Sequence, residues 1–140
     1  MPLLSQTTQY ALYALTYLGQ LPEGEFAFAK TIAEAEDVPP NYLAKVLQRL
    51  ARTGLLESVR GPGGGFRLKV SLDTVTLDSV RSLFEGPWSE RICVLGRKQC
   101  GDLNPCAAHP QFKPVADQMY SYLQETSVAH LVSGVDEVQT

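Results

Sequence analysis

Several features common in other protein classes are missing from this sequence. No apolar run approaches the ~20 residues that a membrane-spanning helix needs, so we expect no membrane association. The N-terminus lacks a basic segment followed by an apolar stretch and a small-residue cleavage site. We therefore expect no signal peptide, and we predict a cytoplasmic protein. A nucleotide fingerprint and a Ser/His/Asp set are also missing, which argues against an enzyme or electron carrier.

Cysteine is scarce, with only Cys93, Cys100 and Cys106 in the chain. An odd number within 14 residues excludes the disulfide framework of a small secreted protein. The spacing contains no C-x-x-C pair, so the usual signals of a zinc knuckle or a thioredoxin are also lacking. In a reducing compartment, such a cluster more often binds metal or carries out redox chemistry.

The cysteine spacing, Cys93-x6-Cys100-x5-Cys106, is followed closely by His109. Three thiolates in one loop can hold three corners of an iron–sulfur cluster, and His109 is the nearest candidate for the fourth ligand. Four such ligands suit tetrahedral zinc equally well. Three unliganded or redox-active thiols in a mobile loop are the remaining alternative, so the spacing alone leaves three possibilities open.

Positive charge is in the minority overall, since the net charge is -3. Taken alone, that value argues against a nucleic-acid partner. Residues 41–69, however, contain six basic residues against the single acid Glu57. Nucleic-acid binding depends on such local patches rather than on the total charge. A solvated basic surface is the simpler alternative.

The N-terminal half is expected to be helical. Residues 5–20 are apolar or small on nearly every face, which predicts a helix buried on all sides. A small protein rarely buries one helix completely, so we expect a partner subunit to cover part of it. A short helix is predicted over Lys30–Glu36, and the prolines at 39 and 40 end it.

A third helix is predicted over residues 40–53, because Pro40 suits a first turn and Gly54 suits the position after the last one. This helix has two distinct faces. Its apolar stripe consists of Tyr42, Leu43, Val46, Leu47 and Leu50. Its polar face carries Asn41, Lys45, Gln48, Arg49 and Arg52.

Two short strands are predicted next, over Leu56–Arg60 and Phe66–Val70. The intervening Gly61-Pro62-Gly63-Gly64-Gly65 permits the positive φ angles of a hairpin tip. A plain flexible turn is one alternative. A phosphate-binding loop is disfavoured, because no Lys-Ser or Lys-Thr follows the glycines.

The C-terminal half contains a predicted helix over Leu77–Glu85, capped by Thr76 and ended by Gly86-Pro87. A last long helix is predicted over about Gln111–Glu125. We divide the chain into a DNA-binding domain (1–86), a cysteine-rich sensor loop (87–109), a dimerisation helix (110–133) and a flexible tail (134–140).

The order of these elements is that of a winged helix-turn-helix, in a mainly α fold with a small β wing. The major groove of B-DNA admits one α-helix, whose polar face reads base edges. A slender glycine-rich tip can enter the minor groove, where arginine is favoured. The predicted DNA-binding residues are Asn41, Tyr42, Lys45, Gln48, Arg49, Arg52, Arg60, Gly61, Gly63, Gly64 and Arg67.

With these motifs in place, the chain resembles the Rrf-two family of winged-helix transcription regulators, of the IscR, NsrR and CymR type. The resemblance runs through residues 4–131, and its most specific string is Ser58-Val59-Arg60-Gly61-Pro62-Gly63-Gly64-Gly65-Phe66. Other matching blocks are Gln9-Tyr10-Ala11-Leu12, Leu47-Gln48-Arg49-Leu50 and Thr126-Ser127-Val128-Ala129-His130-Leu131.

This resemblance implies a bacterial homodimer that binds a double-stranded DNA operator. It also implies a 2Fe–2S or 4Fe–4S cluster, which a purified sample can lack, at Cys93, Cys100 and Cys106. In one branch the fourth ligand matches His109, and in another it is an acidic residue at the position of Gln9. Since Gln9 is a poor anionic ligand, we favour His109.

Our leading hypothesis is a transcriptional repressor whose DNA affinity depends on the cluster. A cluster-free repressor controlled by thiols or by a partner is the alternative within regulation. A winged-helix module that binds other proteins is the alternative outside it.

Overall fold

The computed structural model describes residues 3–88, 93–97 and 100–139, with side chains described as far as residue 134. Its elements, in chain order, are α1 (Gln6–Gln20), α2 (Ala29–Glu36), α3 (Pro40–Arg52), β1 (Leu56–Val59), β2 (Gly65–Leu68), η1 (Leu72–Thr74), α4 (Leu77–Glu85), α5 (His109–Glu125) and α6 (Val128–Gln139). The predicted fold class is confirmed: the chain is mainly helical, with a two-stranded antiparallel wing.

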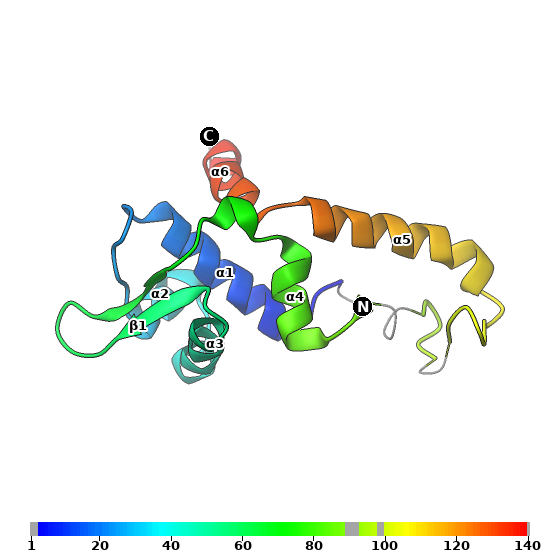
Figure 1. The fold of residues 1–140 in the computed structure, drawn as a ribbon, viewed down its shortest axis with the longest axis horizontal. Coiled ribbons are helices and arrows are strands. Elements are labelled where there is room, and N and C mark those ends of the chain that lie inside the picture. Colours follow the sequence, from blue (N-terminus) through cyan, green and yellow to red (C-terminus); the bar gives the residue numbers. More distant parts are fainter. Residues whose placement is uncertain (1–2, 89–92, 98–99, 140) are drawn as a thin grey trace.

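Helix α1 runs through the middle of the DNA-binding half (Figure 1). The Ser5 side chain caps it by accepting a hydrogen bond from the Thr8 N–H. Ala11, Ala14 and Leu15 are fully buried. Within one chain the helix is not buried on every side, since the Tyr13 side chain is 43% exposed. The predicted cover of this face by a partner subunit stays a prediction.

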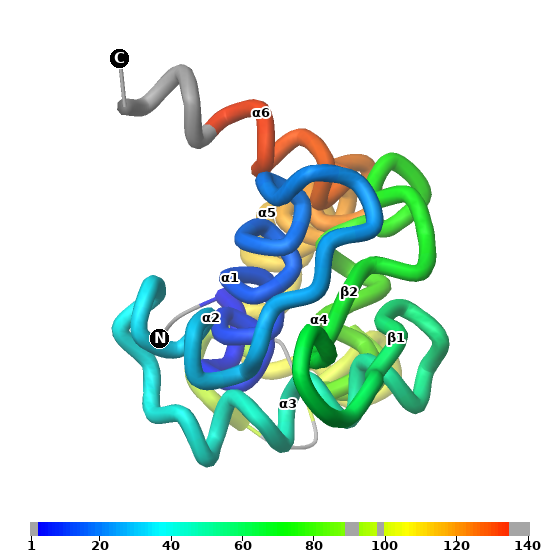
Figure 2. The backbone as a smooth tube through the Cα atoms, turned by 90° about the vertical axis from the view of Figure 1, so that its left-hand side faces the viewer, coloured from blue at the N-terminus to red at the C-terminus, as the bar shows by residue number. Residues whose placement is uncertain are grey.

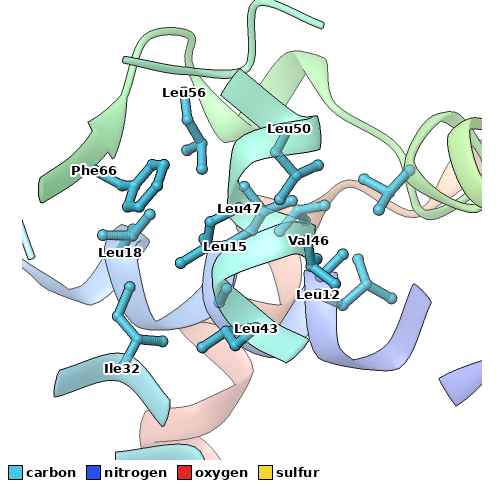
Figure 3. Close-up of a cluster of buried hydrophobic side chains, with 14 of the residues drawn as sticks. Leu12, Leu15, Leu18, Ile32, Leu43, Val46, Leu47, Leu50, Leu56 and Phe66 are labelled. Atoms are coloured by element: carbon cyan, nitrogen blue, oxygen red, sulfur yellow. The ribbon is translucent and has the colours of Figure 1, made fainter. Parts of the chain in front are cut away.

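Helices α2 and α3 form the helix-turn-helix. Helix α2 ends at Asp37, whose left-handed backbone (φ 55°) starts the turn. Pro40 then begins α3, as predicted. The apolar stripe of α3 packs against α1 and α2 through Leu43, Leu47 and Leu50, all 0% exposed (Figure 3). Because these side chains fill the core, the opposite face of α3 is held toward solvent.

The wing is a short hairpin in which Leu56 pairs with Leu68 and Val59 pairs with Gly65. Both strands are shorter than predicted: β1 ends at Val59, and β2 runs from Gly65 to Leu68. A third segment supports the hairpin, since Ala27 and Phe66 exchange backbone hydrogen bonds of 2.9 and 2.8 Å. Strand β2 is thus fixed to the loop between α1 and α2.

Helix α4 matches its predicted bounds. Thr76 and Ser79 form a reciprocal capping box at its start, and Gly86 (φ 76°) ends it. Leu77 and Val80 point into the core, at 4% and 0% exposure. The helix lies between the DNA-binding half and the C-terminal segments (Figure 1).

The C-terminal region consists of the long helix predicted over about Gln111–Glu125 and a second helix, within the segment that we assigned to one dimerisation helix (110–133). Helix α5 begins at His109, earlier than expected, and tolerates Pro114 inside it. It ends at Glu125, and α6 starts at Val128 and continues to Gln139, through most of the predicted tail. Tertiary pairing causes the break, because Leu77 N donates to Thr126 O (2.9 Å) and Val128 N donates to Val75 O (2.8 Å).

The elements form an elongated molecule. The wing and the cysteine loop lie at opposite ends of its long axis, and α5 extends away from the body toward the loop (Figure 1). In the second view, α6 projects from the body beside the end of α1 (Figure 2). No helix in the described ranges combines the length and hydrophobicity that crossing a bilayer requires.

Candidate DNA interface and metal centre

The solvent face of α3 carries four of the predicted DNA-binding side chains. Asn41, Lys45, Gln48 and Arg52 are all exposed. Within the part of the chain that the structure describes, none of these side chains forms a hydrogen bond or ion pair. Their donors therefore remain available to a ligand that faces this helix.

Tyr42 has a different environment on the same helix. Its hydroxyl hydrogen-bonds with the Thr7 hydroxyl of α1. The edge of its ring packs against the Tyr10 ring, with the centroids 5.5 Å apart. Tyr42 is 40% exposed, so it joins α3 to α1 and still presents part of its ring to solvent.

Arg49 is engaged by α4 rather than directed freely into solvent. Its Nη2 donates to the Leu83 carbonyl oxygen at 2.6 Å. Its guanidinium also lies 5.2 Å from the centre of the Phe84 ring. Sequence patterning placed Arg49 on the polar face of α3, and it could not reveal these partners on another helix.

The wing tip is exposed and tightly turned. Arg60, Gly61 and Gly63 are exposed, whereas Gly64 is buried. A Cβ atom at Gly64 would lie 2.3 Å from the Val59 carbonyl oxygen, so no larger residue fits this turn. Among the described residues, the Arg60 side chain has no hydrogen-bond or ion-pair partner. The tip therefore presents one unpaired cation on a narrow backbone.

Arg67 is held at the base of the wing. Its Nε and Nη2 atoms lie 2.8 and 2.7 Å from Glu57 Oε2, directly across the hairpin. The guanidinium also covers the Phe26 ring at 4.6 Å from the centroid. Its charge is partly balanced by Glu57, so Arg67 offers less to an anion than Arg60 does.

The three cysteines come together at the start of α5. Their Sγ atoms all lie within 4.8 Å of one another, although Cys93 and Cys106 are 13 positions apart in the sequence. The Sγ atoms of Cys93 and Cys106 are separated by 3.7 Å. Cys93 is buried, and Cys100 and Cys106 are half-buried. This arrangement provides three sulfur ligands that could bind a metal ion or cluster.

His109, the first residue of α5, lies beside this cluster. Its Nδ1 is 3.5 Å from Cys100 Sγ, and its Nε2 is 3.0 Å from Asp102 Oδ1. The hydrogen bond with His109 lowers the pKa of Asp102. A carboxylate on one ring nitrogen of histidine directs the other nitrogen toward a metal. The sequence analysis missed Asp102, since no spacing rule distinguishes it from other loop acids.

The thiols differ in acidity. The pKa of Cys93 is lowered to about 7, mainly because the Arg97 backbone N–H donates to its sulfur. The backbone N–H of Cys106 also favours the Cys100 thiolate, but burial and the neighbouring thiols outweigh it and raise the pKa of Cys100. The thiolate is the ligand form of cysteine, so Cys93 is in the metal-binding form at a lower pH than Cys100.

Comparisons with known proteins agree with this arrangement. The profile of the Rrf2 family, described as an iron-dependent transcriptional regulator, matches residues 4–134. The chain belongs to the Rrf2 family. It is 31% identical over 133 residues to a candidate HTH-type transcriptional regulator of Aquifex aeolicus, which covers 94% of this chain and 92% of the relative. This Rrf2 protein is thus a transcriptional regulator and not an enzyme.

A second relative matches a shorter part of the chain. The candidate HTH-type transcriptional regulator BadM of Rhodopseudomonas palustris is 44% identical over 82 residues, or 59% of this chain and 52% of the relative. Among solved structures, B. subtilis CymR, the global cysteine regulator, superposes with a TM-score of 0.77 at 23% identity, covering 95% and 98% of the two chains. T. potens IscR gives a TM-score of 0.75 at 21% identity, covering 97% and 90%. These similarities establish the Rrf2 fold.

Proposed function

We propose that this Rrf2 protein is a DNA-binding repressor whose operator affinity is controlled by an iron–sulfur cluster. Cys93, Cys100, Cys106 and His109 would hold the cluster. The protein would bind a double-stranded operator as a homodimer. Membership of a family described as iron-dependent transcriptional regulators supports iron over other metals.

One observation carries the proposal: three sulfur atoms and one ring nitrogen converge on a single site. Cys93 and Cys106 are 3.7 Å apart, and Cys100 and His109 Nδ1 are 3.5 Å apart. Two ligands at about 2.3 Å from one tetrahedral ion are about 3.8 Å apart. Both separations suit ligands that share one metal ion, and Cys100 Sγ lies within 4.8 Å of the other two sulfurs. The site therefore brings together four donors of the kinds that hold iron–sulfur clusters.

The DNA-binding side of the proposal rests on exposed donors. Lys45, Gln48 and Arg52 line the open face of α3, and side chains of these types bond to purine edges or phosphates. The unpaired Arg60 at the wing tip suits a phosphate or a narrow minor groove. We assign Arg49 and Arg67 a weaker part in recognition, because α4 and Glu57 already engage them.

The dimer is supported by the exposed apolar surface of α5. Val115 and Tyr122 are 48% and 54% exposed and are one heptad apart on the same face. Exposed apolar surface of this kind marks interaction sites. A two-fold dimer would place two α3 helices on two half-sites of a symmetric operator.

The residues around the proposed cluster site have different roles. When bound, the cluster supplies a redox-active group whose state can change with oxidant or iron supply. Asp102 orients the His109 ring, and the N–H groups that face Cys93 favour its thiolate. Ligation would tie Cys93, which follows α4, to Cys106 and His109 at the start of α5. A change at this site is therefore transmitted to both helices.

The test begins with protein purified under anaerobic conditions. We expect a coloured protein with iron and sulfide in equal amounts, whereas a zinc form would be colourless. Operator affinity is then compared for the loaded protein, the cluster-free protein and Cys100→Ala, at one fixed salt concentration because phosphate contacts are salt-dependent. We expect the loaded form to differ from both others. Equal affinities in all three, with the dimer preserved, would refute cluster control.

A further inference from the structure

A fully buried arginine in α4 is explained by neither the DNA surface nor the cysteine centre. The Arg81 side chain is 2% exposed, and its Nε and Nη2 atoms each lie 2.8 Å from Asp78 Oδ1. Its Nη1 donates to the Gly86 carbonyl oxygen at 3.0 Å. A buried charge is unfavourable unless it is fully paired. Arg81 therefore fixes the C-terminal end of α4, and its guanidinium also lies 5.3 Å from the centre of the Trp88 ring.

Trp88 connects this arginine to the cysteine loop. Its ring stacks on Tyr120 of α5, with the centroids 5.3 Å apart and the planes 15° from parallel. Trp88 also lines a cavity of about 170 Å³ whose other walls include Cys100 and His109. A rearrangement of the loop would alter this cavity, which also gives the indole ring space to move. Trp88 is the single tryptophan of the chain.

The same end of α4 contacts the recognition helix. Leu83 and Phe84, in the last turn of α4, bind Arg49 of α3 through the 2.6 Å hydrogen bond and the ring contact. Glu85, in the same turn, accepts hydrogen bonds from Ser5 N (3.1 Å) and Thr8 Oγ1 (2.6 Å). A shift of this turn must therefore be accommodated by α3 and α1.

We propose that Arg81 and Trp88 are positioning residues that transmit the state of the cysteine loop to α3 within one chain. Loop rearrangement moves Trp88 between its stack on Tyr120 and the adjoining cavity. Arg81 and the last turn of α4 move with Trp88. This movement changes the orientation of α3 through the contacts of Arg49. The inference rests on the proposed cluster control, since two sites are coupled only if each state of one favours a different state of the other.

The first experiment measures coupling as a ratio. The probe is a duplex that the wild-type protein selects from a randomised library. The affinity of cluster-loaded protein is divided by that of cluster-free protein for wild type, Trp88→Leu and Arg49→Met. Uniform losses of DNA contact cancel in this ratio. We expect both variants to bring it closer to one by roughly threefold or more, while Lys30→Met, which removes an exposed cation on α2, serves as the matched control and keeps the wild-type ratio.

Iron and sulfide contents are measured first, so that a reduced ratio cannot reflect a lost cluster. Arg49 lies outside the loop, so its variant remains informative if Trp88→Leu fails to load. A wild-type ratio different from one that both variants retain would overturn this inference alone and would favour control through subunit spacing. A wild-type ratio of one would overturn the proposed function and this inference with it.

A second readout needs no cluster. Coupling is reciprocal, so saturating the cluster-free protein with the selected duplex must change the surroundings of Trp88. We expect a change in its fluorescence emission in wild type and little change in Arg49→Met at equal saturation. Unchanged emission in wild type would contradict the route through α4.

Discussion

At the scale of single residues, the arginines of the DNA-binding half fall into two groups. Arg49 and Arg67 have protein partners, on α4 and across the wing respectively. Arg60 has no partner in the described ranges, and it stands beside the glycine tip. Charge counting treats these residues alike, although only the unpaired group can be lost without disturbing the fold.

We expect Arg60→Ala to weaken operator binding by about 1–3 kcal/mol, because one phosphate or minor-groove contact is lost. The free energy of unfolding should stay the same, since no intramolecular bond is removed. Titrations across a salt series measure the first quantity and urea denaturation measures the second. Arg97→Ala, which also removes one exposed cation, is the control. Unchanged affinity at every salt concentration would exclude Arg60 from the interface.

A second residue-scale prediction concerns Cys93 in the reduced, metal-free protein. Because its pKa is lowered to about 7, the thiolate forms as the pH rises through 7 and is lost as the pH falls below it. Ultraviolet thiolate absorbance should therefore show a first step near this pH. Metal binding should weaken below it, since a proton must then be displaced.

The control for this titration is Cys93→Ser, which should lose the early step. The thiol of Cys100 should ionise later, because its pKa is raised. A single step near the ordinary cysteine pKa in the wild type would contradict the role of the Arg97 N–H.

At the scale of elements, the wing depends on close backbone contacts. Gly65 has φ +113°, and a Cβ atom there would lie 2.4 Å from the Ala27 carbonyl oxygen. Gly63 also has a positive φ, +76°, but open space surrounds its Cβ position. Substitution of Gly63 by alanine would introduce backbone strain alone, whereas the same substitution at Gly65 would add steric overlap.

We expect Gly65→Ala to reduce the free energy of unfolding by roughly 3 kcal/mol, from the positive φ and the overlap together. Gly63→Ala should cost about 1 kcal/mol, from the positive φ alone. Urea denaturation of both variants checks the difference. Equal losses of unfolding free energy in the two variants would contradict this expectation, because they would mean that the loop carrying Ala27 moves away at no cost.

Elements with local signals could be predicted from the sequence. Thr76 and Gly86 bound α4, and Pro40 begins α3, because caps and prolines act within one turn. The end of α5 at Glu125 agrees with the predicted bound. The separate helix α6 was not predicted, since its start depends on the pairing of Thr126 and Val128 with Leu77 and Val75. The cysteines and His109 were identified as candidate ligands from spacing. The partners of Arg49 and the position of Asp102 required the folded chain.

At the scale of the whole molecule, the exposed apolar face of α5 predicts an obligatory contact between copies. We expect Tyr122→Glu to shift the dimer toward monomer, because a charge on this face would be desolvated in the interface. Operator affinity should fall with it, since one half-site would remain. Analytical ultracentrifugation measures the first effect.

Gln124→Glu is the matched control, because it adds the same charge to the opposite, exposed face of α5. It should remain dimeric. A concentration-independent monomer mass for the wild type would contradict the dimer itself.

The backbone bonds at Thr126 and Val128 give α5 a mechanical property. They clamp one end of the helix to the start of α4, and the cysteine loop lies at the other end (Figure 1). A helix of 17 residues is about 25 Å long, so a tilt of roughly 10° about the clamp would move its far end by about 4 Å. The helix is thus a lever with its fulcrum at Thr126. A large displacement at the sulfur atoms therefore corresponds to a small displacement of the backbone near Thr126. This geometry suits a loop that senses a change more than a loop that is driven by one.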